Sequence, residues 1–128
     1  MGLFTYTPGQ DSNSSYLRES FEEGLAKPYR HIEGGDKEAL SDACQAVGVF
    51  ASSESNWYER NTIIIHAGSS VASMQKGELR DTITSILERC CELEAGETIQ
   101  LTAEEKQFIK NGIEGKFFKT VSRKPFYE

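Results

Sequence analysis

The spacing of apolar residues between Leu79 and Leu93 constrains the fold of this chain more than any other feature. These residues recur at steps of three and four, which places them on one face of an α-helix with 3.6 residues per turn. Polar and charged residues fill the positions between them, and Gly96 follows where a left-handed residue commonly ends a helix. The pattern predicts an amphipathic helix whose apolar positions are Leu79, Ile83, Ile86, Leu87, Cys90 and Leu93.

The segment before this helix is compatible with two structures. Residues 63–65 are three isoleucines, which suit a short buried strand, and residues 66–70 would then form a turn into a helix. Such a turn can present backbone N–H groups to a phosphate. No second strong strand is present to pair with this one, and a lone strand leaves its backbone groups without partners. We therefore favour helix for residues 61–66, within one long helix in which small residues around Gly68 let another helix approach closely.

Two more helices are predicted nearer the N-terminus. The first runs from about Ser15 to Ala26, because Pro28 disfavours helical structure at the residue before it. Gly34 breaks the chain before the second helix, which begins near Asp36. The apolar faces consist of Leu17, Phe21 and Leu25 in the first helix, and of Leu40, Ala43, Cys44, Val47 and Phe50 in the second.

A last helix is predicted after a capping box formed by Thr102 and Glu105. In this motif the threonine hydroxyl accepts a hydrogen bond from a backbone N–H in the first turn, and the glutamate carboxylate accepts one from the backbone N–H of the threonine. Gly112 and Gly115 weaken the helix by roughly 1 kcal/mol each relative to alanine, unless they permit a kink or a close contact. The apolar pattern continues at steps of four through Ile109, Ile113, Phe117 and Val121.

Five helices with short connections and no convincing sheet predict an all-α bundle, and 128 residues suit a single domain. We expect residues 1–14 to form a short extended arm and loop, residues 15–121 to form the bundle, and residues 122–128 to form an extended tail. No apolar run approaches the roughly 20 residues that span a bilayer, so no transmembrane segment is expected. The first residues also lack the basic and apolar regions of a secretory signal.

The cysteines indicate a reducing compartment. Their number is odd, and Cys90 and Cys91 are adjacent, which does not fit a disulfide framework. Cys44 and Cys90 lie on predicted apolar faces, where cysteine behaves as a small hydrophobic residue rather than a nucleophile. We therefore expect a cytoplasmic location and no cysteine catalysis.

Charge is distributed unevenly along the chain. Residues 1–105 carry a net charge of −10, whereas residues 106–128 carry a net charge of +4. An acidic body argues against wrapping nucleic acid over a broad surface, so nucleic acid is not the expected partner. The basic end is a candidate for docking on an acidic surface, including that of a neighbouring copy of this protein.

No motif predicts catalysis, a cofactor or a metal site. Neither histidine has a second histidine or a cysteine three or four residues away, as a metal site commonly requires. Phosphate-binding loops, nucleophile elbows and zinc-protease motifs are also missing from the sequence. An alternative hypothesis is a small-molecule or nucleotide-binding protein, or an enzyme, whose ligand would contact His31, His66, Gly68, Ser69 and Ser70.

The C-terminal stretch is the best functional lead, because basic and aromatic residues alternate there. Such mixtures are common in binding hot spots, and they can also stack on bases or lie on a membrane surface. The simpler interpretation is that Phe117 completes the core and the lysines are solvated. Our leading hypothesis is a non-enzymatic intracellular protein–protein interaction module, such as an adaptor, an inhibitor or immunity-type protein, or an assembly component. It would bind a protein partner, or another copy of itself, through Lys116, Phe118, Lys119, Arg123, Lys124, Phe126 and Tyr127.

Overall fold

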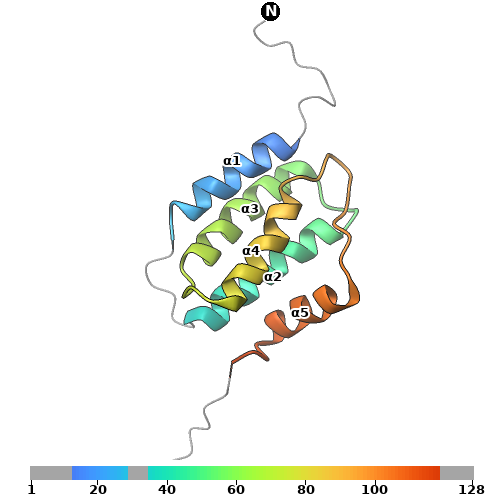
Figure 1. Ribbon diagram of the computed structural model, residues 1–128. Helices are drawn as coiled ribbons and strands as arrows, with labels where there is room; N and C mark the ends of the chain where they lie inside the picture. The colour runs from blue at the N-terminus through green and yellow to red at the C-terminus, as the bar shows by residue number, and fades with distance from the viewer. Residues whose placement is uncertain (1–12, 29–34, 119–128) are drawn as a thin grey trace, which may run out of the picture.

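The computed structural model describes residues 13–28 and 35–118, with side chains described from residue 17 onward. Within these ranges every regular element is a helix, which confirms the predicted all-α bundle. The helices, coloured along the chain in Figure 1, are α1 (Asn13–Leu25), α2 (Gly35–Ala51), α3 (Trp57–Ala72), α4 (Glu78–Cys90) and α5 (Ala103–Glu114).

Helix α3 settles the choice between strand and helix. Asn56 caps it, since its side-chain oxygen accepts a hydrogen bond of 2.8 Å from the backbone N–H of Glu59. Residues 61–66 lie inside the helix, so the strand-and-turn alternative is wrong. The apolar positions Ile64 and Val71 are buried against neighbouring helices. Trp57, seven residues before Ile64, lies at the first turn with 46% of its surface exposed and is not part of the core.

Helices α1 and α3 run in the same direction and touch through their backbones. Ser20 donates to the side-chain oxygen of Asn61 at 3.0 Å, and further along both helices Ser69 donates to the carbonyl of Gly24 at 3.2 Å. A Cβ atom added at Gly68 would lie 2.5 Å from the carbonyl oxygen of Phe21. The prediction that small residues around Gly68 allow a close helix contact is therefore confirmed.

Helix α2 is the central element, and it packs against α3, α4 and α5. Its C-terminal end is capped by the buried side chain of Arg60, which donates to the hydroxyl of Ser55 at 2.9 Å and to the carbonyls of Phe50 and Ser52 at 3.4 Å. The guanidinium also stacks on the Phe50 ring, with its carbon 5.1 Å from the ring centre. Arg60 thus fixes the turn between α2 and α3 by partners that carry no charge.

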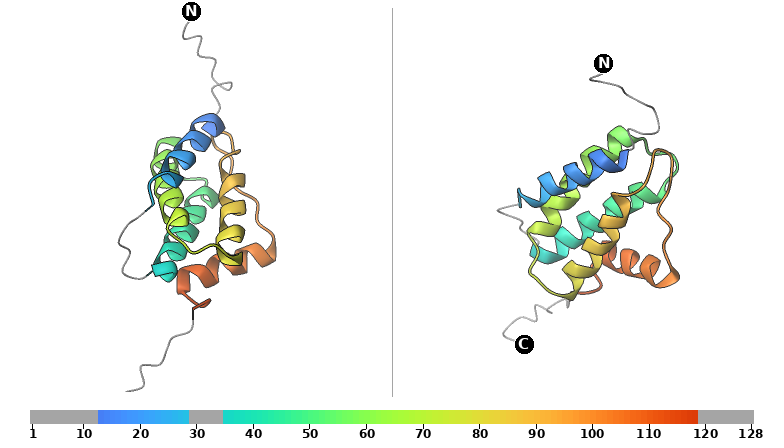
Figure 2. Two further views of the ribbon diagram at one scale, coloured as in Figure 1. Left: turned by 60° about the vertical axis from the view of Figure 1, so that its left-hand side comes forward. Right: turned by 45° about the horizontal axis from the view of Figure 1, so that its top comes forward.

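Helix α5 packs against α2 and crosses the lower edge of the bundle in the left view of Figure 2. The connection from α4 runs back along the molecule, and the N–H of Ile99 donates to the carbonyl of Phe50 at 3.0 Å on the way. The predicted capping box of Thr102 and Glu105 is present. Helix α5 packs on α2 through Gly112, where an added Cβ would collide with the sulfur of Cys44.

The predicted continuation of α5 toward Val121 is wrong. The helix ends at Glu114, because Gly115 adopts a left-handed conformation with φ of +73° and terminates it. Ile113 and Phe117 are consequently partly exposed, at 42% and 37%, instead of completing the core. Val121 lies outside the described residues. The reversal at Gly115 determines how the chain leaves the bundle.

Candidate functional site

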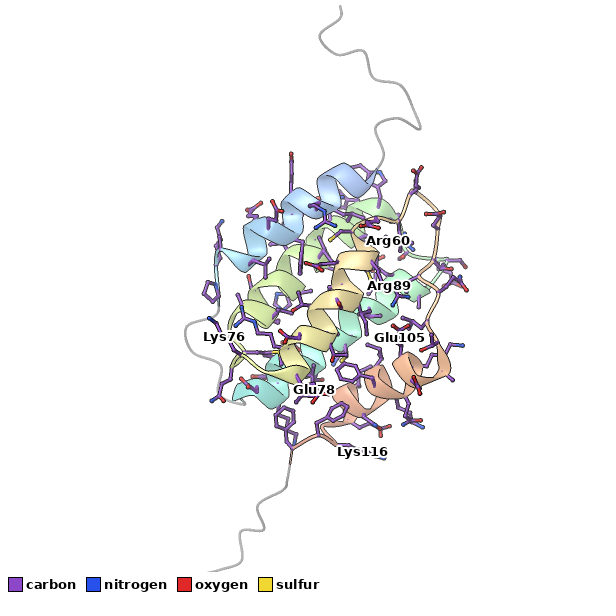
Figure 3. The ribbon with its side chains drawn as sticks, in the orientation of Figure 1. Arg60, Lys76, Glu78, Arg89, Glu105 and Lys116 are labelled. Carbon is purple, nitrogen blue, oxygen red and sulfur yellow. The ribbon has the colours of Figure 1, made fainter. Side chains whose placement is uncertain are left out.

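A groove with a volume of about 480 Å³ separates the first half of α4 from α5. It exists because α5 packs on α2, while no backbone of α4 comes close to that of α5. Figure 3 shows Glu78 at the beginning of α4 and Glu105 at the beginning of α5, on either side of this space. The groove is lined by Glu78, Leu79, Thr82, Glu104, Glu105, Phe108 and Phe117.

The inner surface of the groove is apolar. The rings of Phe108 and Phe117 lie with their centres 5.0 Å apart at an angle of 41°, a favourable tilted arrangement. Leu79 and Phe108 pack against the core and are partly exposed on the groove side. An incoming apolar side chain would therefore find a preformed surface to cover.

The rim of the groove is acidic. Glu78 and Glu104 lie in the first turns of α4 and α5, where a negative charge interacts favourably with the helix dipole. Neither carboxylate forms an ion pair with any residue in the described ranges. Both are exposed, so their charge is available to a cation that enters the groove.

The third carboxylate of the groove, that of Glu105, is engaged in holding the fold. It accepts from the backbone N–H of Thr102 at 3.0 Å and from Arg89 at 2.6 Å. The bond from Thr102 and the nearby Arg89 lower the pKa of Glu105 below its usual value. Arg89 also donates to the carbonyl of Gln100, so its side chain links the end of α4 to the segment that begins α5.

The predicted C-terminal binding segment divides into two parts. Its first residues belong to the folded structure: Lys116 pairs with Glu114 at 3.2 Å, Phe117 lines the groove, and Phe118 is half-buried against the core. The predicted partner-binding residues Lys119, Arg123, Lys124, Phe126 and Tyr127 lie outside the described residues. The structure therefore brings the beginning of this segment to the groove.

The alternative ligand site at residues 66–70 has no open cradle. Gly68 lies beneath the backbone of α1, and Ser69 donates to a carbonyl of α1. The hydroxyl of Ser70 is buried within the bundle and has no hydrogen-bond partner among the described residues. A phosphate would have to displace a packed helix to reach these groups.

Of the two histidines in the alternative ligand site, the structure describes only His66. His66 lies on the surface of α3, with Nε2 3.9 Å from Oδ2 of Asp42 on α2. Burial raises the pKa of Asp42, although His66 opposes the shift. His31 lies outside the described residues. Among the described side chains, no three acidic, histidine or cysteine groups lie close enough together to hold a metal ion.

The three cysteines are buried and unpaired. Burial raises the pKa of Cys44 and of Cys91 to about 12, and it raises the pKa of Cys90 as well. Thiols with raised pKa values are poor nucleophiles at neutral pH because little thiolate is present.

Within the described ranges, no helix is both long enough and apolar enough to cross a bilayer.

Comparison with protein-family models, with curated proteins and with solved structures found no match to this chain. Glu78, Glu104 and Phe108 were not singled out as binding residues by their sequence pattern. Glu104 and Glu105 follow the capping threonine, so their sequence context predicts a helix start, and Glu78 is one acid among many. Only their arrangement around one apolar groove distinguishes them.

Proposed function

We propose that this protein is a non-enzymatic protein–protein interaction module, and that its groove between α4 and α5 binds a basic segment with aromatic side chains. The observation that carries the proposal is an apolar groove bordered by two carboxylates, Glu78 and Glu104, that form no ion pair with any described residue. An adaptor, an inhibitor or immunity-type protein, or an assembly component would each use such a surface.

The chemistry of the groove favours a cationic partner with apolar surface. Lysine and arginine side chains can lay their aliphatic stems along Leu79 and Phe108 while their charged ends reach the rim. An arginine can in addition stack on the exposed face of Phe117. Oppositely charged rims increase the rate of association and exclude acidic competitors. The volume of about 480 Å³ holds a few side chains, which suits a short peptide segment rather than a large flat interface.

The expected role of the C-terminal segment is consistent with this proposal. Phe117 forms part of the groove, and the basic and aromatic residues that follow begin at its edge. A partner that binds the groove would therefore meet this segment as well. We propose that the groove is the docking surface, and that the segment, which carries the same kinds of side chain as the expected partner, acts at its edge.

Panning a random 12-residue peptide display library against the full-length protein tests this function. Selected peptides are expected to combine lysine or arginine with aromatic residues and to bind less tightly as salt rises, since exposed charges are screened. Selection against a Glu78→Lys, Glu104→Lys double variant should lose these sequences. The matched control is Glu88→Lys, an exposed acid on α4 that does not line the groove. Peptides without cations, or peptides bound equally by the double variant, would refute the proposal.

A further inference from the structure

The chain leaves the bundle at the groove itself. After the left-handed Gly115, the N–H of Lys116 donates to the carbonyl of Asn111 at 2.9 Å, and the N–H of Phe118 donates to the carbonyl of Gly115 at 3.2 Å. These bonds turn the backbone so that Phe117 rests on Phe108. The described part of the chain therefore ends one residue after Phe117, which lines the groove.

The segment that follows matches the groove in chemistry. Residues 119–128 carry three basic side chains and one acidic side chain, together with adjacent aromatic residues. The acids at the rim, Glu78 and Glu104, have no cationic partner in the described part of the chain. The same combination of cation and aromatic ring that the groove favours thus occurs within reach, in Lys119, Arg123, Lys124, Phe126 and Tyr127.

The length of this segment is sufficient. Ten extended residues reach about 33 Å, whereas the 12 residues of α5 span about 18 Å. Residues 119–128 can therefore follow the whole groove from the end of α5 back to its beginning. A segment attached directly at the site acts at an effective concentration on the order of 1 mM, which favours the same chain over a second copy.

We infer that residues 119–128 are the resident ligand of the groove in their own chain, and that an external partner must displace them. The inference rests on the proposed function, because it assigns an occupant to the same groove. Its consequence is that the chain restrains its own binding. A partner with a similar basic and aromatic segment competes with the tail, and any change that removes the positive charge of the tail opens the groove.

Fluorescence anisotropy with a labelled peptide of residues 119–128 tests the inference. The titrated proteins are the wild-type chain, a full-length triple variant (Lys119→Gln, Arg123→Gln, Lys124→Gln) and a chain that ends at Phe118. Neither modification changes a residue of the described helices. If the peptide binds the free groove with a Kd of about 100 µM, a tail at about 1 mM weakens its binding to the wild type about tenfold. Both modified proteins should therefore bind about ten times more tightly than the wild type.

The other outcomes separate the inference from the proposed function. Equal binding to all three proteins would overturn the inference and leave the groove as a binding site. No binding to any of them would overturn both proposals. Light scattering adds a further check: a wild-type dimer that disappears in the triple variant would assign the groove to the tail of a second copy and overturn occupancy by the same chain.

Discussion

Two pairs of helices in this bundle differ in how closely they approach each other. Helices α1 and α3 approach until their backbones touch, because Gly24 and Gly68 face each other where any side chain would collide with a carbonyl of the opposite helix. Helices α4 and α5 stay apart, and Leu79 and Phe108 face a groove between them. Helices α1 and α3 can approach closely because glycines at the contact carry no side chain. A groove remains between α4 and α5 because α5 packs against α2 instead of α4.

Because of this difference, we expect the α1–α3 contact to contribute mainly to stability and the groove to contribute mainly to binding. At the α1–α3 contact, backbone atoms of the opposite helix lie directly against Gly24 and Gly68, so changes there are expected to alter the free energy of unfolding strongly. At the groove, Glu78 and Glu104 contact mainly solvent, so their replacement should alter binding and leave stability almost unchanged.

Replacing Gly68 by alanine should lower the free energy of unfolding by about 3 kcal/mol, because the new methyl group meets backbone atoms of α1 that cannot move away alone. Urea unfolding followed by circular dichroism measures the change. The control is Gly48→Ala, at an exposed position of α2 with open space around it, which should raise stability by about 1 kcal/mol through helix propensity. If both variants changed the free energy of unfolding in the same direction, the interpretation that Gly68 permits a close contact between α1 and α3 would be contradicted.

Replacing Gly112 by alanine should lower the free energy of unfolding by about 2 kcal/mol, because the methyl group collides with the sulfur of Cys44. This variant tests whether α5 is held by α2 and not by α4. A double-mutant cycle with Cys44→Ala isolates the clash, since removing the sulfur should restore part of the loss. Strictly additive effects of the two substitutions would place the anchor of α5 elsewhere.

Replacing Glu105 by glutamine should lower the free energy of unfolding by about 1 kcal/mol at pH 7, through loss of the charged contact with Arg89 and the helix N-terminus. The pKa of Glu105 is lowered in the folded state, so its stabilising contribution is complete above its ordinary value of 4.5. It is lost as the pH falls below that value. Urea titrations at pH 7 and pH 3 should show the difference from wild type shrinking at pH 3, with Glu88→Gln as the control. If the difference in the free energy of unfolding between wild type and Glu105→Gln did not depend on pH, the charge of Glu105 would not be the source of the stabilisation.

Replacing Glu78 and Glu104 together by glutamine should change the free energy of unfolding by less than about 0.5 kcal/mol, as is usual for exposed positions. The same variant should lose several-fold in affinity for a basic, aromatic peptide, measured by anisotropy. A loss of stability above about 1 kcal/mol would mean that these acids support the fold, and the contrast between the two helix pairs would fail.

Sequence reasoning and structure agree where the information is local. The capping box at Thr102 and the spacing that defines α4 as far as Cys90 depend on neighbours within a few turns, and both were predicted correctly. Leu93 was expected on the same helix but lies beyond its end. The end of α5 was missed because steps of four continue to Val121 in the sequence, while one left-handed glycine, Gly115, ends the helix. Trp57 is 46% exposed, because large size alone does not place a residue in the core.

By itself, the sequence determined the helices, because periodicity and capping are local properties that a short segment carries with it. It also located the basic and aromatic C-terminal residues. The tertiary structure alone decided that α5 docks on α2 through Gly112 and stands apart from α4. That docking brings acids from the starts of two helices, Glu78 and Glu104, to the edges of one apolar groove. Contacts between residues distant in sequence depend on how whole helix faces fit together, which no single segment encodes.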